Sequence, residues 1–158
     1  MKKLKLYLDT SVISHLDASD TPEKMQDTLK LWEEIKSGLY DIVISDVVME
    51  EIARCAEPKR GNLLNSLAEI NCFRATITDE IRAIAEQIVS LGILNEKSRD
   101  DCLHIGTAIV NQCNYIVSWN FKHMVNIKTI NGVRAITSLG GYNSIDIIQP
   151  TMLVEKGD

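Results

Sequence analysis

The stretch LYLDTSVI, residues 6–13, places a short apolar run directly before Asp9, followed by a turn that carries the hydroxyls of Thr10 and Ser11. Such a run predicts a buried strand at 4–9 in an open α/β sheet, where ligands collect beyond the carboxyl ends of parallel strands. Asp9 is equally suited to cap a following helix through its side chain. This stretch alone therefore leaves two roles open for Asp9, ligand binding and helix capping.

The rest of the chain alternates between strand and helix patterns. Met25, Leu29, Trp32 and Ile35, for example, recur at the spacing of one helix face. Further strands are predicted at 41–45, 71–77, 114–118 and 132–138, with helices at 22–38, 47–57, 59–69, 79–91 and 99–113. This order predicts an α/β fold with a central, mostly parallel sheet and helices on both faces. We expect one domain in residues 1–139, with an irregular tail, 140–158, packed on it.

Composition excludes several classes of protein. A chain of 158 residues with 45% hydrophobic and 25% charged residues is typical of one globular domain, and no apolar run approaches the roughly 20 residues of a membrane span. The start, MKKLKLYLD, lacks the cleavage site of a signal peptide. The four cysteines show no metal-ligand spacing, so we expect reduced thiols in a cytoplasmic protein without a membrane association.

The charge is uneven along the chain. A net charge of −5 argues against binding nucleic acid over the whole surface. Residues 22–51 hold eight acids and three lysines, whereas residues 97–134 hold five lysines and arginines and two acids. The second stretch leaves open a basic rim beside an acidic site, or simply solvated surface.

Two acidic doublets join Asp9 as candidate site residues. In the helix after the second strand, Glu51 borders the buried stripe, whereas Glu50 lies about 100° further round. In the late helix, Asp101 lies on the inward side and Asp100 turns outward. Acids are also common in first turns and on exposed helix faces, which is the reading we favour for Glu50 and Asp100.

The order of these acids resembles the PIN domain family of nucleases. LYLDTSVI is similar to the family's opening motif, SDVVMEEI (45–52) to its serine-to-glutamate helix, and RDDCLHIGTAI (99–109) to its late helix. YIVSWNFKHM (115–124) is similar to the fourth strand and its turn, where the family often carries a further acid and this chain has Asn120. The resemblance assigns the family's acids to Asp9, Glu51 and Asp101.

The resemblance implies a site for Mg²⁺ or Mn²⁺ with Asp9, Glu51 and Asp101 as ligands, directly or through water, since these ions prefer hard oxygen donors. Asn120 would orient a water or a neighbouring carboxylate. Thr10, Ser11, Lys122 and His123 are candidate substrate contacts, although capping and plain surface charge explain them as well. His104 and Trp119 are better explained as rim or core residues.

The implied activity is that of a VapC-like endoribonuclease, a metal-dependent hydrolase of single-stranded RNA and the toxin of a type II toxin–antitoxin pair. A cognate antitoxin and a homodimer follow from the resemblance only. The alternatives left open are a catalytically silent PIN-fold binding or scaffold protein and a DNA-directed nuclease. A haloacid-dehalogenase-like phosphatase also has an Asp after its first strand, but it needs a second Asp where this chain has Ser11.

Overall fold

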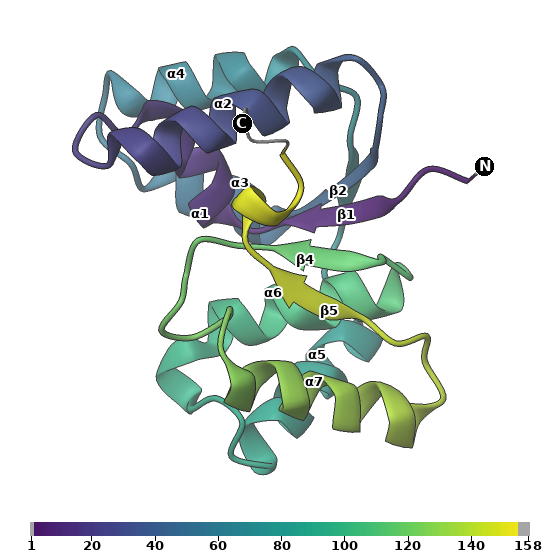
Figure 1. The fold of residues 1–158 in the computed structure, drawn as a ribbon. Coiled ribbons are helices and arrows are strands. Elements are labelled where there is room, and N and C mark those ends of the chain that lie inside the picture. Colours follow the sequence, from purple (N-terminus) through teal and green to yellow (C-terminus); the bar gives the residue numbers. More distant parts are fainter. Residues whose placement is uncertain (1, 155–158) are drawn as a thin grey trace.

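The computed structural model describes residues 2–154, which form a single five-stranded sheet covered by helices on both faces (Figure 1). The strands lie in the order β3-β2-β1-β4-β5, and every pairing is parallel. The α/β prediction with a central parallel sheet is therefore confirmed. The strands are β1 (Lys5–Leu8), β2 (Asp41–Ser45), β3 (Phe73–Ala75), β4 (Tyr115–Val117) and β5 (Asp146–Ile148).

Helices connect successive strands, as parallel pairing requires. Within the described residues the α-helices are α1 (Thr10–Ser14), α2 (Pro22–Lys36), α3 (Asp46–Ala53), α4 (Lys59–Ala68), α5 (Asp79–Ser90), α6 (Arg99–Val110) and α7 (Ile127–Gly140). Three short 3-10 helices are η1 (His15–Asp17), η2 (Glu96–Ser98) and η3 (Pro150–Met152). In Figure 1, α2 and α4 lie on one side of the sheet, and α5, α6 and α7 lie on the other.

The core has two parts because the side chains of each strand alternate between the two faces of the sheet. In β1, Leu6 and Leu8 pack into the cluster that contains Trp32 of α2, whereas Tyr7 packs into the cluster that contains Ile105 of α6. All five side chains are buried. The two clusters fix β1 at the centre of the sheet and so fix the position of Asp9 beyond its end.

The sheet contains a topological switch point between β1 and β4. The chain runs from β1 to β2 on one side and later returns to place β4 on the other side of β1. In open α/β sheets the crevice at such a point is the usual place for a ligand. Asp9 and Ser118 follow β1 and β4 at this crevice.

The predicted fifth strand at 132–138 is wrong, because these residues lie in α7. Val133, Ile136 and Thr137 are buried at helical spacing, and the Asn126 side chain caps the helix by accepting a hydrogen bond from Thr129 N. β-branched residues favour strands on average, but tertiary packing overrides that preference here.

The true fifth strand, β5, lies in the tail that was predicted to be irregular. Ile147 pairs with Ile116 of β4, so the tail adds an edge strand to the sheet. The pattern Ile145, Ile147, Ile148 is too short to distinguish a strand from a loop in the sequence. Residues 155–158 of the predicted tail lie outside the described residues. Within residues 2–154 no helix has the length and apolar character needed to cross a membrane.

Helix α6 packs closely on α5 at a glycine. A Cβ added at Gly106 would lie 2.9 Å from the carbonyl oxygen of Ile81 and 3.2 Å from its side chain. The nearest atom belongs to the backbone of α5, so a side-chain rotation cannot relieve the clash and one of the two helices would have to shift. Gly106 thus sets how closely α6, the helix that carries Asp101 and His104, approaches α5.

Replacing Gly106 with Ala is expected to lower the free energy of unfolding by about 1–3 kcal/mol, because the added methyl group overpacks the contact between α5 and α6. Gly61→Ala in α4 is the matched control, since its Cβ meets only the flexible carboxylate of Glu57. That variant should be neutral or gain up to about 1 kcal/mol from helix propensity. Denaturant unfolding measures both, and an equal effect at the two glycines would contradict this account.

Candidate active site

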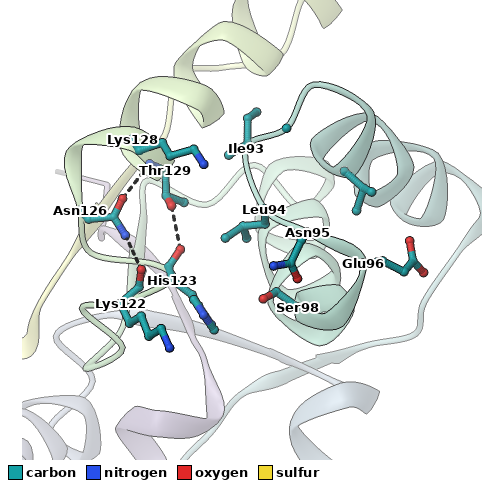
Figure 2. Close-up of a pocket in the computed structure, with 12 residues that line it drawn as sticks. Ile93, Leu94, Asn95, Glu96, Ser98, Lys122, His123, Asn126, Lys128 and Thr129 are labelled. Carbon is teal, nitrogen blue, oxygen red and sulfur yellow. Dashed lines mark hydrogen bonds between the residues drawn. The ribbon is translucent and has the colours of Figure 1, made fainter.

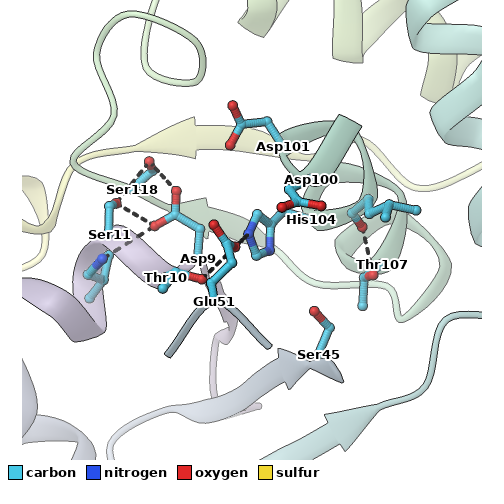
Figure 3. A network of polar contacts seen from close by, with 12 residues as sticks. Asp9, Thr10, Ser11, Ser45, Glu51, Asp100, Asp101, His104, Thr107 and Ser118 are labelled. Atoms are coloured by element: carbon cyan, nitrogen blue, oxygen red, sulfur yellow. Dashed lines mark hydrogen bonds and ion pairs between the residues drawn. The ribbon is translucent and has the colours of Figure 1, made fainter. Parts of the chain in front are cut away.

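The carboxyl ends of three strands supply the floor of the candidate site. Asp9 follows β1, Ser45 ends β2 and Ser118 follows β4. Parallel pairing brings these ends to one edge of the sheet, and Figure 3 shows the three residues grouped there. Helices α3 and α6 begin at the same edge and add Glu51 and Asp101. The acids predicted from separate motifs are thus brought to one side of the molecule.

The carboxylate of Asp9 is buried, with the residue only 3% exposed. It accepts hydrogen bonds from Ser11 Oγ at 2.5 Å, from Ser118 Oγ and from Val12 N at 3.3 Å. Burial raises the pKa of Asp9, and His104 and the hydrogen bonds oppose this rise without cancelling it. Asp9 caps α1, so the capping role is confirmed, and ligand binding by its buried carboxylate stays a prediction.

Glu51 is held by two hydrogen bonds on one oxygen. His104 Nε2 lies 2.7 Å from Oε1, and Thr10 Oγ1 donates to the same atom at 2.8 Å. Burial opposes ionisation of Glu51, but the His104 contact, Thr10 and the charge of Arg54 outweigh it, so the net pKa of Glu51 is lowered. Among the described residues no group bonds Oε2, which leaves that oxygen free to bind water or an ion.

His104 is buried and connects Tyr7 of β1 to Glu51 of α3. Its Nδ1 lies 2.6 Å from the Tyr7 hydroxyl, which in turn lies 2.8 Å from Ser45 Oγ. Burial alone would lower the pKa of His104, but the Glu51 hydrogen bond and the charges of nearby acids raise it overall. In the imidazolium form both ring N–H groups donate, one to Tyr7 and one to Glu51.

Asp101 faces the site from the first turn of α6, with its side chain 20% exposed. Its Oδ2 lies 3.1 Å from Nδ1 of His123. Burial raises the pKa of Asp101, and the charge of Asp9 adds to this, while His104 and His123 oppose it. Asp100 points elsewhere: it is 44% exposed and accepts a hydrogen bond from Arg54, as its predicted outward orientation requires.

The remaining predicted residues surround these acids. Asn120 Oδ1 accepts a hydrogen bond from His123 N, and Asn120 N donates to Ser118 Oγ. Asn120 is thus linked to Asp9 through Ser118 and to Asp101 through His123. Ser11 Oγ, besides bonding Asp9, accepts a hydrogen bond from Trp119 N at 2.8 Å. Thr10 and Ser11 therefore hold acids, and their contact with substrate stays a prediction, as does that of Lys122 and His123.

The donor set fits a hard divalent cation. Burial opposes ionisation of both Asp9 and Asp101, the charge of Asp9 adds to this at Asp101, and a cation between them would relieve that cost. Within the described residues, however, no group of three or more acids, histidines or cysteines is closed around a metal position. Mg²⁺ commonly keeps several waters and needs only one or two direct carboxylates, so an open arrangement of this kind suits it.

The sequence analysis did not assign four of the residues found here to the site: Tyr7, Ser45, His104 and Ser118. His104 was expected at the rim or in the core, and it is a core residue that also contacts Glu51. Ser45 and Ser118 could have been found by the signal that found Asp9, since both are polar residues at the ends of predicted strands. Tyr7 carries no such signal because it lies inside a strand.

Comparison with known proteins places these observations in a family. A family model described as PIN domain matches residues 6–121, which include Asp9, Glu51, Asp101 and Asn120. Among solved structures, a chain in the crystal structure of VapBC2 from Rickettsia felis bound to a DNA fragment from their promoter is similar, with a TM-score of 0.55 and 13% sequence identity. That alignment covers 92% of this chain and 98% of the other, and at this identity it shows the fold alone. A search of curated proteins finds no match.

Asp101→Asn is expected to stabilise the metal-free protein at pH 7 by about 0.5–2 kcal/mol, as replacements at functional sites often do. The folded-state pKa of Asp101 is raised, so its ionisation costs folding free energy. The gain should therefore be absent below the ordinary aspartate pKa of about 4, grow as pH rises from there toward the folded-state pKa, and level off above it. Denaturant unfolding in EDTA between about pH 4 and pH 7 measures it.

The matched control is Asp100→Asn, the same chemical change at the adjacent exposed position. It should alter the free energy of unfolding by less than about 0.5 kcal/mol. A variant at Asp101 that is less stable than the wild-type protein in EDTA at pH 7 would contradict the charge assignment.

Proposed function

The chain belongs to the PIN domain family, and we propose that it is a metal-dependent endoribonuclease that hydrolyses phosphodiester bonds of single-stranded RNA. The observation that carries the proposal is the buried carboxylate of Asp9 at the switch point, facing Asp101 and flanked by Glu51. Acids kept in such a place cost stability and are typical of functional sites. The family's nucleases supply the reaction class.

Asp9, Glu51 and Asp101 would hold Mg²⁺ or Mn²⁺, directly or through water. A divalent cation bound there neutralises charge on the phosphodiester and lowers the pKa of water. Hydrolysis forms a bond between a water oxygen and phosphorus and breaks one P–O ester bond, so no side-chain nucleophile is required. The chain's own contribution is orientation: Ser11 and Ser118 fix Asp9, and Thr10 and His104 fix one oxygen of Glu51.

Asn120 acts in this proposal as a positioning residue. Its side chain and backbone connect the turn after β4 to both Asp9 and Asp101, through Ser118 and His123. Because Asn120 is neutral where the family often carries an acid, the site has one negative charge fewer. We expect one tightly bound ion, with a second arriving with the substrate.

The biological role proposed is that of the toxin in a type II toxin–antitoxin pair. Support comes from the likeness of the fold to a chain of the VapBC2 structure. A cognate antitoxin that covers the acidic site and a homodimer are part of this proposal. A catalytically silent binding protein is the second candidate, favoured by Asn120 and by the absence of a closed metal cluster within residues 2–154.

Incubating a pool of single-stranded RNAs with the purified protein in Mn²⁺ or Mg²⁺ tests the proposal. We expect cleavage by the wild-type protein and by Asp100→Asn. Cleavage by Asp101→Asn should be at least about a hundredfold slower, because loss of a metal ligand or of a residue that supports one typically lowers activity by about 10–100-fold or more. EDTA should abolish cleavage. The same sequences made with deoxyribose should survive, since the 2′-hydroxyl distinguishes RNA.

Equal cleavage by wild type and Asp101→Asn would point to a contaminating nuclease or a misplaced site. Absence of cleavage by a folded wild-type protein would favour the silent binding protein. Equal cleavage of the deoxyribose strand would indicate a DNA-directed enzyme.

A further inference from the structure

A pocket of about 430 Å³ lies beside the candidate site, between the segment that leads into α6 and the turn that leads into α7 (Figure 2). The residues used below are Ile93, Leu94, Ser98, Lys122, His123 and Lys128, all of which line it. The volume falls within the range of ordinary small-ligand pockets, about 300–1,000 Å³. We call it the lysine pocket.

One wall of the lysine pocket is basic. Lys122 and Lys128 both line the pocket, and Figure 2 shows the side chain of Lys128 extending toward Ile93. Among the described residues neither lysine has an ion-pair partner. The one acid in the lining, Glu96, is bound by the guanidinium of Arg99, with Nη2 2.7 Å from Oε2. Because that guanidinium also pairs with Glu86, Glu96 is only partly compensated, and the pocket presents two lysines against one carboxylate.

The opposite wall combines an apolar surface with an unused polar group. Ile93 and Leu94 are buried and form the apolar part. Ser98 is 7% exposed and stands at the N-cap of α6, yet its hydroxyl makes no capping hydrogen bond and has no other partner within residues 2–154. Among residues 2–154 the one fully buried side-chain polar atom without a partner is Trp32 Nε1, so Ser98 Oγ keeps some exposed surface and is free to hydrogen-bond a molecule in the pocket. In Figure 2 the Ser98 oxygen points into the pocket.

One lining residue of the lysine pocket, His123, contacts the acid Asp101. Nδ1 of His123 lies 3.1 Å from Asp101 Oδ2. Ser98 lies three residues before Asp101, at the start of the same helix. A chain bound with its phosphodiester at Asp101 would pass over His123 directly into the pocket.

We propose that the lysine pocket binds the nucleotide next to the scissile phosphodiester, with its phosphate at Lys122 and Lys128 and its base between Ile93, Leu94 and the Ser98 hydroxyl. Cations, an apolar wall and an unpaired hydrogen-bonding group in one cavity match the three parts of a nucleotide. This inference rests on the proposed function, because it assumes that RNA reaches the acids. It adds that the enzyme holds the substrate on the Asp101 side of the site.

Binding of a fluorescent 2′-O-methyl single-stranded RNA in EDTA tests the pocket without cleavage. Lys128→Ala should raise Kd about tenfold at low salt and reduce the slope of log K against log salt by about 0.7, the effect of one lost phosphate contact on a single strand. Ser98→Ala should raise Kd at least about threefold while leaving the thermal midpoint of the free protein unchanged, because the hydroxyl caps nothing. Lys97→Ala is the matched control, an exposed lysine on the same segment that does not line the pocket.

Weaker binding by Lys128→Ala and Ser98→Ala, with Lys97→Ala within about twofold of wild type, supports the pocket. Wild-type affinity in both pocket variants, or an equal loss in Lys97→Ala, overturns it. If the wild-type protein cleaves RNA with metal while both pocket variants bind normally, the proposed nucleotide site is contradicted and the proposed nuclease activity is supported. If the wild-type protein never cleaves RNA but the variants bind as expected, the proposed nuclease activity is contradicted, and the lysine pocket is supported as a site that binds RNA.

Discussion

The buried imidazole of His104 connects the parts of the molecule on which the site depends. It contacts Tyr7 of β1 and Glu51 of α3 from its own place on α6, and Tyr7 extends the contact to Ser45 of β2. One side chain thus ties two strands and two helices together at the carboxyl edge of the sheet. Burial alone would lower the pKa of His104, but its hydrogen bond to Glu51 and the charges of Asp9, Glu51 and Asp101 raise it overall.

The site is a balance between burial and charge. The pKa values of Asp9 and Asp101 are raised, chiefly by burial. The pKa of Glu51 is lowered, because its contacts with His104 outweigh the effect of burial. Such an arrangement is stable only because the surrounding core is well packed, with apolar clusters on both faces of the sheet. A divalent cation bound between these carboxylates, as proposed above, would offset the negative charge that makes Asp9 and Asp101 hard to ionise.

Local patterns in the sequence predicted those features that a single segment determines. Asp9 was found from one strand end, and the inward orientation of Glu51 and Asp101 followed from helix periodicity. The contact between His104 and Tyr7 was not predicted because it joins residues 97 positions apart. The lysine pocket likewise needs segments 93–98 and 122–129 to meet. In α7, the β-branched residues Val133, Ile136 and Thr137 suggested a strand, and only their packing against the sheet decides for a helix.

The proposed function requires the acids at the switch point to hold a divalent cation. Anomalous scattering from a crystal grown with Mn²⁺ tests this most directly, because it locates the ion without reference to activity. The account predicts an anomalous peak between the carboxylates of Asp9 and Asp101, with Glu51 contacting the ion directly or through water. A crystal containing Mn²⁺ with no peak at these carboxylates, or with the ion bound only elsewhere, would contradict it.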